Sequence, residues 1–202
     1  MMFHRTAASK CAAALTVTFC LSAPLLAQER TAHPFPRIHI DNFGQISDTY
    51  YRGAQPNARG FAELAALGVR TVIDLTGEDH GNEKLMVEQA GMTFYRIPLT
   101  TSAWPSQLAT SLFLKLVSDP ANQPVFVHCQ GGRHRTGVMT AFYRMTHDGW
   151  TAGQAVTEMK QYRFDRFPTH PSLKSFVFDY YSHLPRTKIT ERDPQTEGAA
   201  SK

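Results

Sequence analysis

The sequence predicts an α/β domain in which a mostly parallel central sheet is flanked by helices. Two observations carry this prediction. Short apolar, β-branched runs alternate along the chain with segments whose apolar residues recur at helical spacing. The chain is also long enough for one hydrophobic core after its N-terminal segment is set aside. In such a fold the active site lies at the carboxyl edge of the sheet, where the strands run into their loops.

Each expected element has a local signal. Residues 38–47 alternate apolar and polar side chains around Asn42-Phe43-Gly44, which favours a hairpin or a bent strand. Asn57 is a candidate N-cap for a helix that Gly68 ends. Further strands are expected at 69–75, 92–99 and 125–127. Further helices are expected at 82–90, 107–117, 138–145, 151–162 and 171–184.

Residues 1–27 have the composition of a secretory signal peptide. Arg5 and Lys10 supply the positive charge, residues 11–27 carry no charge, and Ala27 is a small residue at the expected cleavage point. The apolar run is short for a membrane span of roughly 20 residues, so we expect cleavage rather than a membrane anchor. We therefore expect a periplasmic or secreted protein. Its parts would be a signal peptide at 1–27, an extended leader at 28–37, a folded domain at 38–184 and a disordered tail at 185–202.

Cleavage would change both the charge and the cysteine count. Loss of Arg5 and Lys10 lowers the formal net charge from +4 to +2, so the balance does not argue for a nucleic-acid or membrane partner. Cys11 and Cys20 would leave with the signal peptide, and Cys129 would remain as a single cysteine. Such a thiol has no resolving partner, so its oxidation would proceed through sulfenic acid toward irreversible forms.

The most informative segment is residues 128–137, which read His-Cys-Gln-Gly-Gly-Arg-His-Arg-Thr-Gly. A tight loop of backbone N–H groups that leads into a helix makes a concave anion site, and Arg135 adds a planar fork that grips two phosphoryl oxygens. The same positive field favours the thiolate of Cys129, which is the nucleophilic form. The alternatives are a buried inert thiol, a zinc ligand and a rhodanese-like sulfur carrier. The glycines, the arginines and the long spacing from cysteine to arginine favour phosphate.

This segment, His-Cys-x5-Arg-Thr-Gly, resembles the phosphate-binding loop of the cysteine-dependent protein tyrosine and dual-specificity phosphatases. Residues 51–56 and 67–75 are similar to the atypical dual-specificity subgroup, and residues 144–150 look like exported bacterial members. The resemblance covers residues 38–184, which would form the phosphatase domain. It implies a compact dual-specificity phosphatase-like fold.

The resemblance also implies a two-step mechanism that requires no metal and no cofactor. Cys129 would attack phosphorus and form a phosphocysteine, and Thr136 would donate a hydrogen bond to the thiolate. His128 would orient the cysteine backbone. Arg133 would meet substrate charge or be an ordinary surface arginine. The expected phosphate-binding residues are Gln130, Gly131, Gly132, Arg133, His134 and Arg135.

The general acid is the uncertain member of the site. The family places an aspartate on a loop after a strand, but the matching stretch here, residues 97–106, contains no carboxylate. Candidates from other loops are Glu78, Asp79 and Asp165. Without an acid the rate depends on the basicity of the leaving group, which favours phenols and phosphoanhydrides over alkyl oxygens. Trp104 and Pro105 would form a pocket wall or pack within the protein.

The sequence thus predicts a phosphatase that hydrolyses phosphate monoesters, with phosphotyrosine favoured. Its partner would be a phosphorylated protein or a small phosphorylated metabolite. Two alternatives remain open: an inositol polyphosphate or pyrophosphate phosphatase, and a non-catalytic phosphate-binding module.

Overall fold

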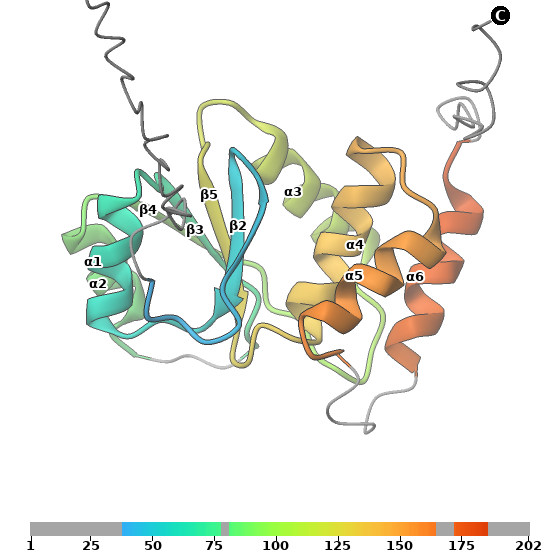
Figure 1. Cartoon of the computed structure of the whole chain (residues 1–202), viewed down its shortest axis with the longest axis horizontal. Coiled ribbons are helices and arrows are strands. Elements are labelled where there is room, and N and C mark those ends of the chain that lie inside the picture. The colour runs from blue at the N-terminus through green and yellow to red at the C-terminus, as the bar shows by residue number, and fades with distance from the viewer. Residues whose placement is uncertain (1–37, 78–80, 165–171, 186–202) are drawn as a thin grey trace, which may run out of the picture. The chain divides into compact units, whose positions relative to one another are not determined.

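The computed structural model describes residues 38–77, 81–164 and 172–185. Within them a five-stranded sheet has the strand order β1-β2-β5-β3-β4 (Figure 1). The β1–β2 pair is antiparallel and the other three pairs are parallel, which confirms the predicted, mostly parallel sheet. The strands are β1 (Gly44–Ser47), β2 (Tyr50–Ala54), β3 (Thr71–Asp74), β4 (Thr93–Arg96) and β5 (Val125–Cys129).

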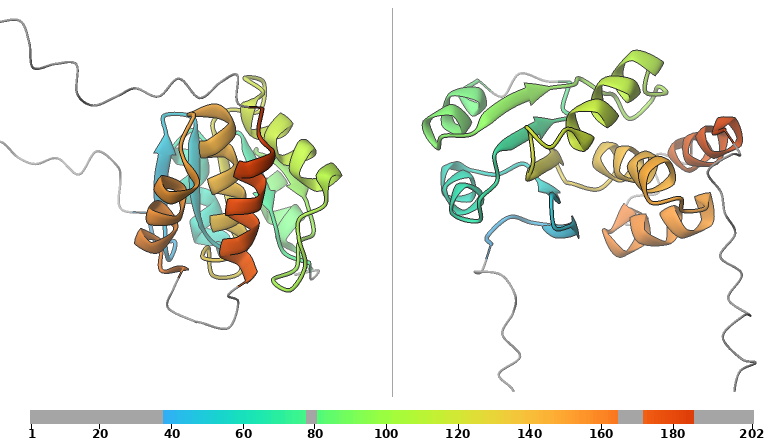
Figure 2. Two further views of the ribbon diagram at one scale, coloured as in Figure 1. Left: turned by 90° about the vertical axis from the view of Figure 1, so that its right-hand side faces the viewer. Right: turned by 90° about the horizontal axis from the view of Figure 1, so that it is seen from above.

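Helices cover both faces of this sheet (Figures 1 and 2). Two lie on one face, α1 (Ala58–Ala66) and α2 (Glu83–Gln89). Four lie on the other, α3 (Gln107–Ser118), α4 (Arg135–His147), α5 (Ala152–Gln161) and α6 (Ser172–His183). No helix in the described ranges has both the length and the apolar character that a membrane crossing requires.

The helix ends follow the capping residues that the sequence offers. Asn57 accepts a hydrogen bond from the Gly60 N–H at 3.0 Å and begins α1, as predicted. Gly68 follows that helix with φ +90°, a backbone conformation that glycine adopts without steric cost. Thr151 and Gln154 form a capping box at the start of α5.

The alternation of side chains along β5 decides which residues reach the active site. Val125 and Val127 pack into the core beside α3 to α6, whereas Phe126 packs into the core beside α1 and α2. Because successive side chains point to opposite faces, Cys129 lies on the α4 side and His128 lies on the α2 side. The four parallel strands end at one edge of the sheet, at Ala54, Cys129, Asp74 and Arg96.

The prediction of a hairpin or a bent strand within residues 38–47 is confirmed in part. The strand β1 lies there, with a register irregularity between Gln45 and Ser47, but the hairpin turn lies at Asp48 and Thr49, between β1 and β2. Asn42 precedes β1 in a left-handed conformation with φ +57°. The strand β1 therefore occupies only the last four of residues 38–47. The strand β2, which pairs with the central strand, was not predicted.

Candidate active site

Cys129 is the last residue of β5, the strand at the centre of the sheet. Its thiol is free and its side chain is only 3% exposed. Six residues later Arg135 begins α4, so residues 130–134 form the loop between the strand and the helix. The thirteen-residue helix directs its N-terminal N–H groups and the positive end of its dipole toward this loop.

Three consecutive carbonyl groups of the loop are held by residues outside it. The Gln130 carbonyl accepts from the Gln55 N–H at 3.3 Å. The Gly132 carbonyl accepts from Asn42 Nδ2 at 2.8 Å and from the Arg52 guanidinium. The Gly131 carbonyl lies 3.4 Å from the same Asn42 nitrogen.

This pattern fixes the direction of the loop N–H groups. Across a planar trans peptide, the N–H of a residue points opposite to the carbonyl of the residue before it. The N–H groups of residues 131–133 therefore point away from Asn42, Arg52 and Gln55. A row of N–H groups held in this way forms a concave site for an anion.

Gly132 cannot be replaced by a larger residue without moving the loop. Its φ is +62°, and an added Cβ would overlap the backbone carbonyl of Gly53 on β2. The loop is thus packed directly on the neighbouring strand, where Ala54 pairs with Cys129.

Comparison with known proteins identifies the family. Residues 41–174 match the family model described as "DSP-PTPase phosphatase fused to NAD+ Kinase", a range that contains the whole sheet and the loop. The dual specificity protein phosphatase TpbA of Pseudomonas aeruginosa is 31% identical over 154 residues, which are 74% of this chain and 69% of TpbA. The chain belongs to the dual-specificity phosphatase family.

One further relative and two crystal structures are also similar to this chain. The inositol diphosphatase SIW14 of Saccharomyces cerevisiae is 27% identical over 62% of this chain and 47% of SIW14. The crystal structure of its core catalytic domain superposes with a TM-score of 0.62 at 22% identity, covering 74% of this chain and 89% of that one. The crystal structure of TpbA gives a TM-score of 0.59 at 27% identity, covering 70% and 89%. The protein is thus a cysteine-dependent phosphatase, as the sequence predicted.

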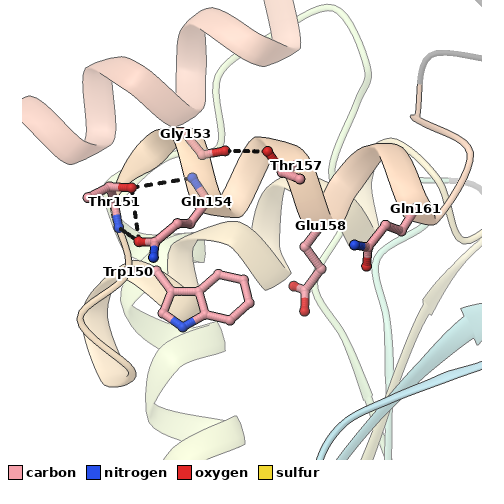
Figure 3. Close-up of a pocket in the computed structure, with 7 residues that line it drawn as sticks. All are labelled: Trp150, Thr151, Gly153, Gln154, Thr157, Glu158 and Gln161. Atoms are coloured by element: carbon pink, nitrogen blue, oxygen red, sulfur yellow. Dashed lines mark hydrogen bonds between the residues drawn. The ribbon is translucent and has the colours of Figure 1, made fainter. Parts of the chain in front are cut away.

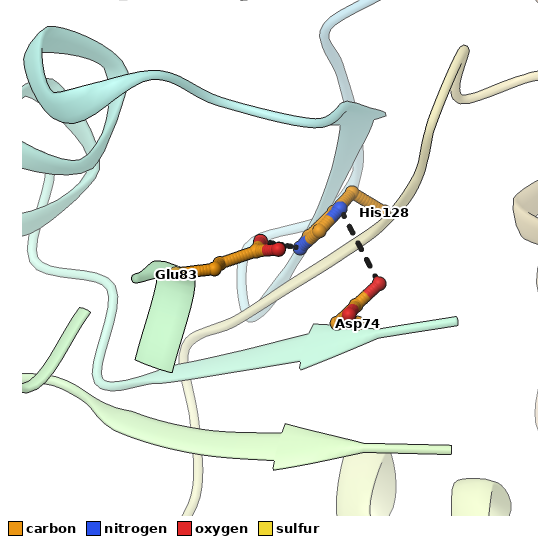
Figure 4. A group of neighbouring side chains, drawn as sticks. All are labelled: Asp74, Glu83 and His128. Atoms are coloured by element: carbon orange, nitrogen blue, oxygen red, sulfur yellow. Dashed lines mark ion pairs between the residues drawn. The ribbon is translucent and has the colours of Figure 1, made fainter. Parts of the chain in front are cut away.

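A buried polar cluster supports the phosphatase loop from the α2 side. His128 Nε2 lies 2.9 Å from Glu83 Oε1, and His128 Nδ1 lies 3.9 Å from Asp74 Oδ1 (Figure 4). Glu83 Oε2 also accepts from Gln55 Nε2 at 2.9 Å. His128 was expected to orient the cysteine backbone. The structure shows its imidazole between two carboxylates, one on β3 and one on α2.

The same three residues have the composition of a metal site, but their arrangement favours direct pairing. Ligand atoms of Asp74, Glu83 and His128 lie within 4.8 Å of one another. However, the two carboxylates approach opposite edges of the imidazole, so one ion cannot bind both through the ring. Asp74 Oδ2 also accepts from Thr76 Oγ1 and Arg96 Nε, each at 2.8 Å. Its Oδ1 accepts from the Thr76 N–H at 2.7 Å, so both oxygens are satisfied without a metal.

Arg52 is buried beneath the loop, on the same face of the sheet as Cys129. Its side chain is 0% exposed, and its guanidinium lies 4.1 Å from the centroid of the Tyr162 ring. Burial lowers the pKa of Arg52, whereas Tyr50, Tyr162 and Cys129 act in the opposite direction.

The loop side chains of Arg133 and His134 both contact other parts of the protein. Arg133 Nη2 lies 3.6 Å from Asp41 Oδ2, and Arg163 Nη1 lies 2.8 Å from Asp41 Oδ1. The imidazole of His134 packs edge-on against Phe164, 5.3 Å between centroids. Arg133 was expected to meet substrate charge or to be a surface arginine; it is only 20% exposed and is turned toward Asp41.

The carboxylate-free loop 97–106 lies beside Arg135, since Arg135 Nη1 donates to the Leu99 carbonyl at 3.3 Å. On this loop one side of Trp104 packs against Phe176 of α6, with 4.2 Å between the ring centroids, while about half of the residue stays exposed.

Thr136 is fully buried, and its hydroxyl has no hydrogen-bond partner among the described residues. The general-acid candidates Glu78, Asp79 and Asp165 lie outside the described residues.

A shallow pocket on α5 is separate from the loop (Figure 3). Three of its polar side chains are already used within the helix: Thr151 and Gln154 cap it, and Thr157 donates to the Gly153 carbonyl at 2.9 Å. Glu158 is held by Arg144 at 2.6 Å. The pocket is lined by Trp150, Thr151, Gly153, Gln154, Thr157, Glu158 and Gln161.

The residues that shape the site but were not predicted from the sequence include Asn42, Arg52 and Glu83. Arg52 had a usable signal, because a charged residue within the apolar run 50–54 must find a buried partner. Asn42 and Glu83 had none, because Asn42 reaches the loop, and Glu83 reaches His128 and Gln55, from segments distant in sequence.

Proposed function

We propose that the protein hydrolyses phosphate monoesters, with phosphotyrosine as the favoured substrate, through a phosphocysteine intermediate on Cys129. The observation that carries this proposal is the loop after β5. A free thiol lies at its base, three of its carbonyls are held outward, and Arg135 stands where α4 begins. This arrangement supports binding of a tetrahedral oxyanion by the amides of residues 130–135 and the Arg135 fork.

In the first step an electron pair of the Cys129 thiolate forms a bond to phosphorus. The ester P–O bond breaks, and its electron pair leaves on the alcohol oxygen, which takes a proton from water or from an acid. In the second step water attacks phosphorus, the S–P bond breaks, and the products are inorganic phosphate, a proton and the regenerated thiolate. Arg135 and the loop amides stabilise the equatorial oxygens in both steps. The buried Thr136 hydroxyl is available to stabilise the departing thiolate.

The preference for phosphotyrosine follows from the leaving group. Loop 97–106 lies beside Arg135 but contains no carboxylate to protonate the leaving oxygen. A phenol, with a pKa of about 10, leaves without such help far more readily than an alkyl alcohol. General acid catalysis is typically worth about 100-fold to 10,000-fold, so alkyl phosphates would be poor substrates.

The test is a panel of matched phosphotyrosine and phosphoserine peptides with purified protein, with and without vanadate. We expect the phosphotyrosine peptide to react at least about 100-fold faster. Cys129→Ser should abolish turnover of both peptides and retain binding. Equal rates on the two peptides would contradict the substrate assignment, and turnover by Cys129→Ser would contradict the mechanism.

The similarity to SIW14 supports a second candidate, a phosphatase of inositol pyrophosphates. SIW14 is named an inositol diphosphatase, and a phosphate leaving group also departs readily without an acid. Adding an inositol pyrophosphate to the same panel separates the two. A higher kcat/KM for it than for phosphotyrosine would favour the second candidate.

We also propose that residues 1–27 direct export and are cleaved, so that the enzyme acts in the periplasm or outside the cell. The charge pattern of the segment supports this proposal. Mass spectrometry of the protein from the periplasmic fraction of an expressing bacterium should give an N-terminus at Gln28. An intact N-terminus on cytoplasmic protein would contradict it.

A further inference from the structure

Arg52 presents an unbalanced charge in the interior of the protein. Its side chain is 0% exposed, and it comes from β2, the strand beside β5. Its Nη2 donates to the Gly132 carbonyl, but Nε and Nη1 are buried without a hydrogen-bond partner. A buried charge is costly unless an opposite charge compensates it.

The surrounding groups that could carry negative charge can be considered in turn. Tyr50, on β2, and Tyr162, which follows α5, both stay neutral at ordinary pH because burial raises their pKa values. Glu158, on α5, is already paired with Arg144 at 2.6 Å. Across residues 38–77, 81–164 and 172–185, no carboxylate lies within ion-pair distance of Arg52.

Cys129 is the remaining group. Arg52 and Cys129 lie on adjacent parallel strands and on the same face, since Arg52 pairs with Val127 and Ala54 pairs with Cys129. Cys129 raises the pKa of Arg52 against the effect of burial. Of the groups around Arg52, Cys129 is thus the one whose ionised form would compensate the buried guanidinium.

We propose that Arg52 is a positioning residue for the reaction: its buried guanidinium is the counter-ion of the Cys129 thiolate and also fixes the Gly132 carbonyl. This inference rests on the proposed role of Cys129 as the nucleophile. Arg52 thereby differs from Arg135, whose guanidinium reaches the Leu99 carbonyl from the start of α4. Arg52 would thus compensate the charge of the nucleophile from within the protein, whereas Arg135, at the start of α4, would hold the phosphoryl oxygens.

The test separates the charge of Arg52 from its hydrogen bond. Arg52→Lys keeps the charge, whereas Arg52→Gln keeps a donor for the Gly132 carbonyl and removes the charge. The readout is the rate of Cys129 alkylation by iodoacetamide at about pH 6, which depends on the thiolate fraction and not on turnover. Arg59→Gln, an exposed arginine on α1, is the matched control for loss of one positive charge.

We expect Arg52→Gln to be alkylated at least about tenfold more slowly than the wild type, with Arg52→Lys and Arg59→Gln close to the wild-type rate. Alkylation of Arg52→Gln at the wild-type rate would overturn the proposal, as would slow alkylation of a folded Arg52→Lys. If Arg52→Gln does not fold, the alkylation rate of Arg52→Lys still tests the proposal. Loss of turnover in Cys129→Ser together with unchanged alkylation of Arg52→Gln would refute this inference alone, and leave the proposed function intact.

Discussion

Glu83 offers the sharpest test of how the loop is supported, because one buried carboxylate serves two partners. Its side chain is 1% exposed, and it lies 2.9 Å from both His128 Nε2 and Gln55 Nε2. His128 directly precedes Cys129, and the Gln55 N–H holds the Gln130 carbonyl at the start of the loop. Glu83→Ala therefore removes the support of the loop on both sides of the nucleophile.

The magnitude follows from burial. Leaving a buried polar group without its partner costs about 1–3 kcal/mol, and Glu83→Ala removes the partner of both His128 and Gln55. That is a large part of the roughly 5–15 kcal/mol that stabilises a typical domain. The measurement is urea unfolding followed by circular dichroism, with comparable m-values for wild type and variant. Glu83→Gln, which keeps the shape and one acceptor oxygen, should lose less.

Glu88→Ala is the matched control on the same helix. Glu88 is 51% exposed and lies 3.7 Å from Lys84, so its removal should change the free energy of unfolding by less than about 0.5 kcal/mol. The account also predicts that Glu83→Ala lowers kcat more than it raises KM, because the nucleophile itself moves. Equal unfolding midpoints for Glu83→Ala and Glu88→Ala would refute the reasoning.

Three further predictions test other parts of the structure. Asn42→Ala removes a buried amide that holds the Gly132 carbonyl, so the free energy of unfolding should fall by about 1–3 kcal/mol in urea titrations, and vanadate should bind more weakly. Asp41→Asn removes the carboxylate that neutralises the arginines beside the loop, so kcat/KM should rise by up to about fivefold for an inositol polyphosphate relative to para-nitrophenyl phosphate. The exposed Asp48→Asn, which removes one negative charge at the β1–β2 turn, should leave that ratio unchanged. Hydrogen bonds from His39 lower the pKa of Glu63 from 4.5 to about 2, so this group stabilises the fold above about pH 4.5 and its contribution disappears as the pH falls toward 2. Glu63→Gln should therefore show a flatter decline of stability over that interval in thermal unfolding curves.

The sequence predicted most of the fold because its local signals agree with its tertiary structure. Asn57 and Gly68 marked the ends of α1, and the apolar run 125–127 marked the central strand. The strand β2 was not recognised because it contains Arg52 and Gly53, which are unusual in a buried central position. Tertiary contacts explain both: Gly53 lies under Gly132, and Arg52 reaches the loop carbonyl.

The candidate site was predictable where its residues are contiguous. Cys129, Arg135 and the loop between them follow one another in the sequence, and a strand, a loop and a helix place them together. The residues that hold the loop come from positions 42, 52, 55 and 83, and only the register of the sheet and the packing of α2 bring them near it. The contacts of Trp104 with α6 and of Arg133 with Asp41 likewise join segments that are distant in sequence.

The covalent intermediate tests the central claim most directly. Wild-type protein would be mixed with para-nitrophenyl phosphate, quenched rapidly by denaturation, digested and analysed by mass spectrometry. The account predicts one added phosphoryl group on the peptide that contains Cys129, its loss when the quench is delayed, and none in Cys129→Ser. Turnover without a phosphorylated cysteine, or a phosphoryl group on another residue, would contradict it.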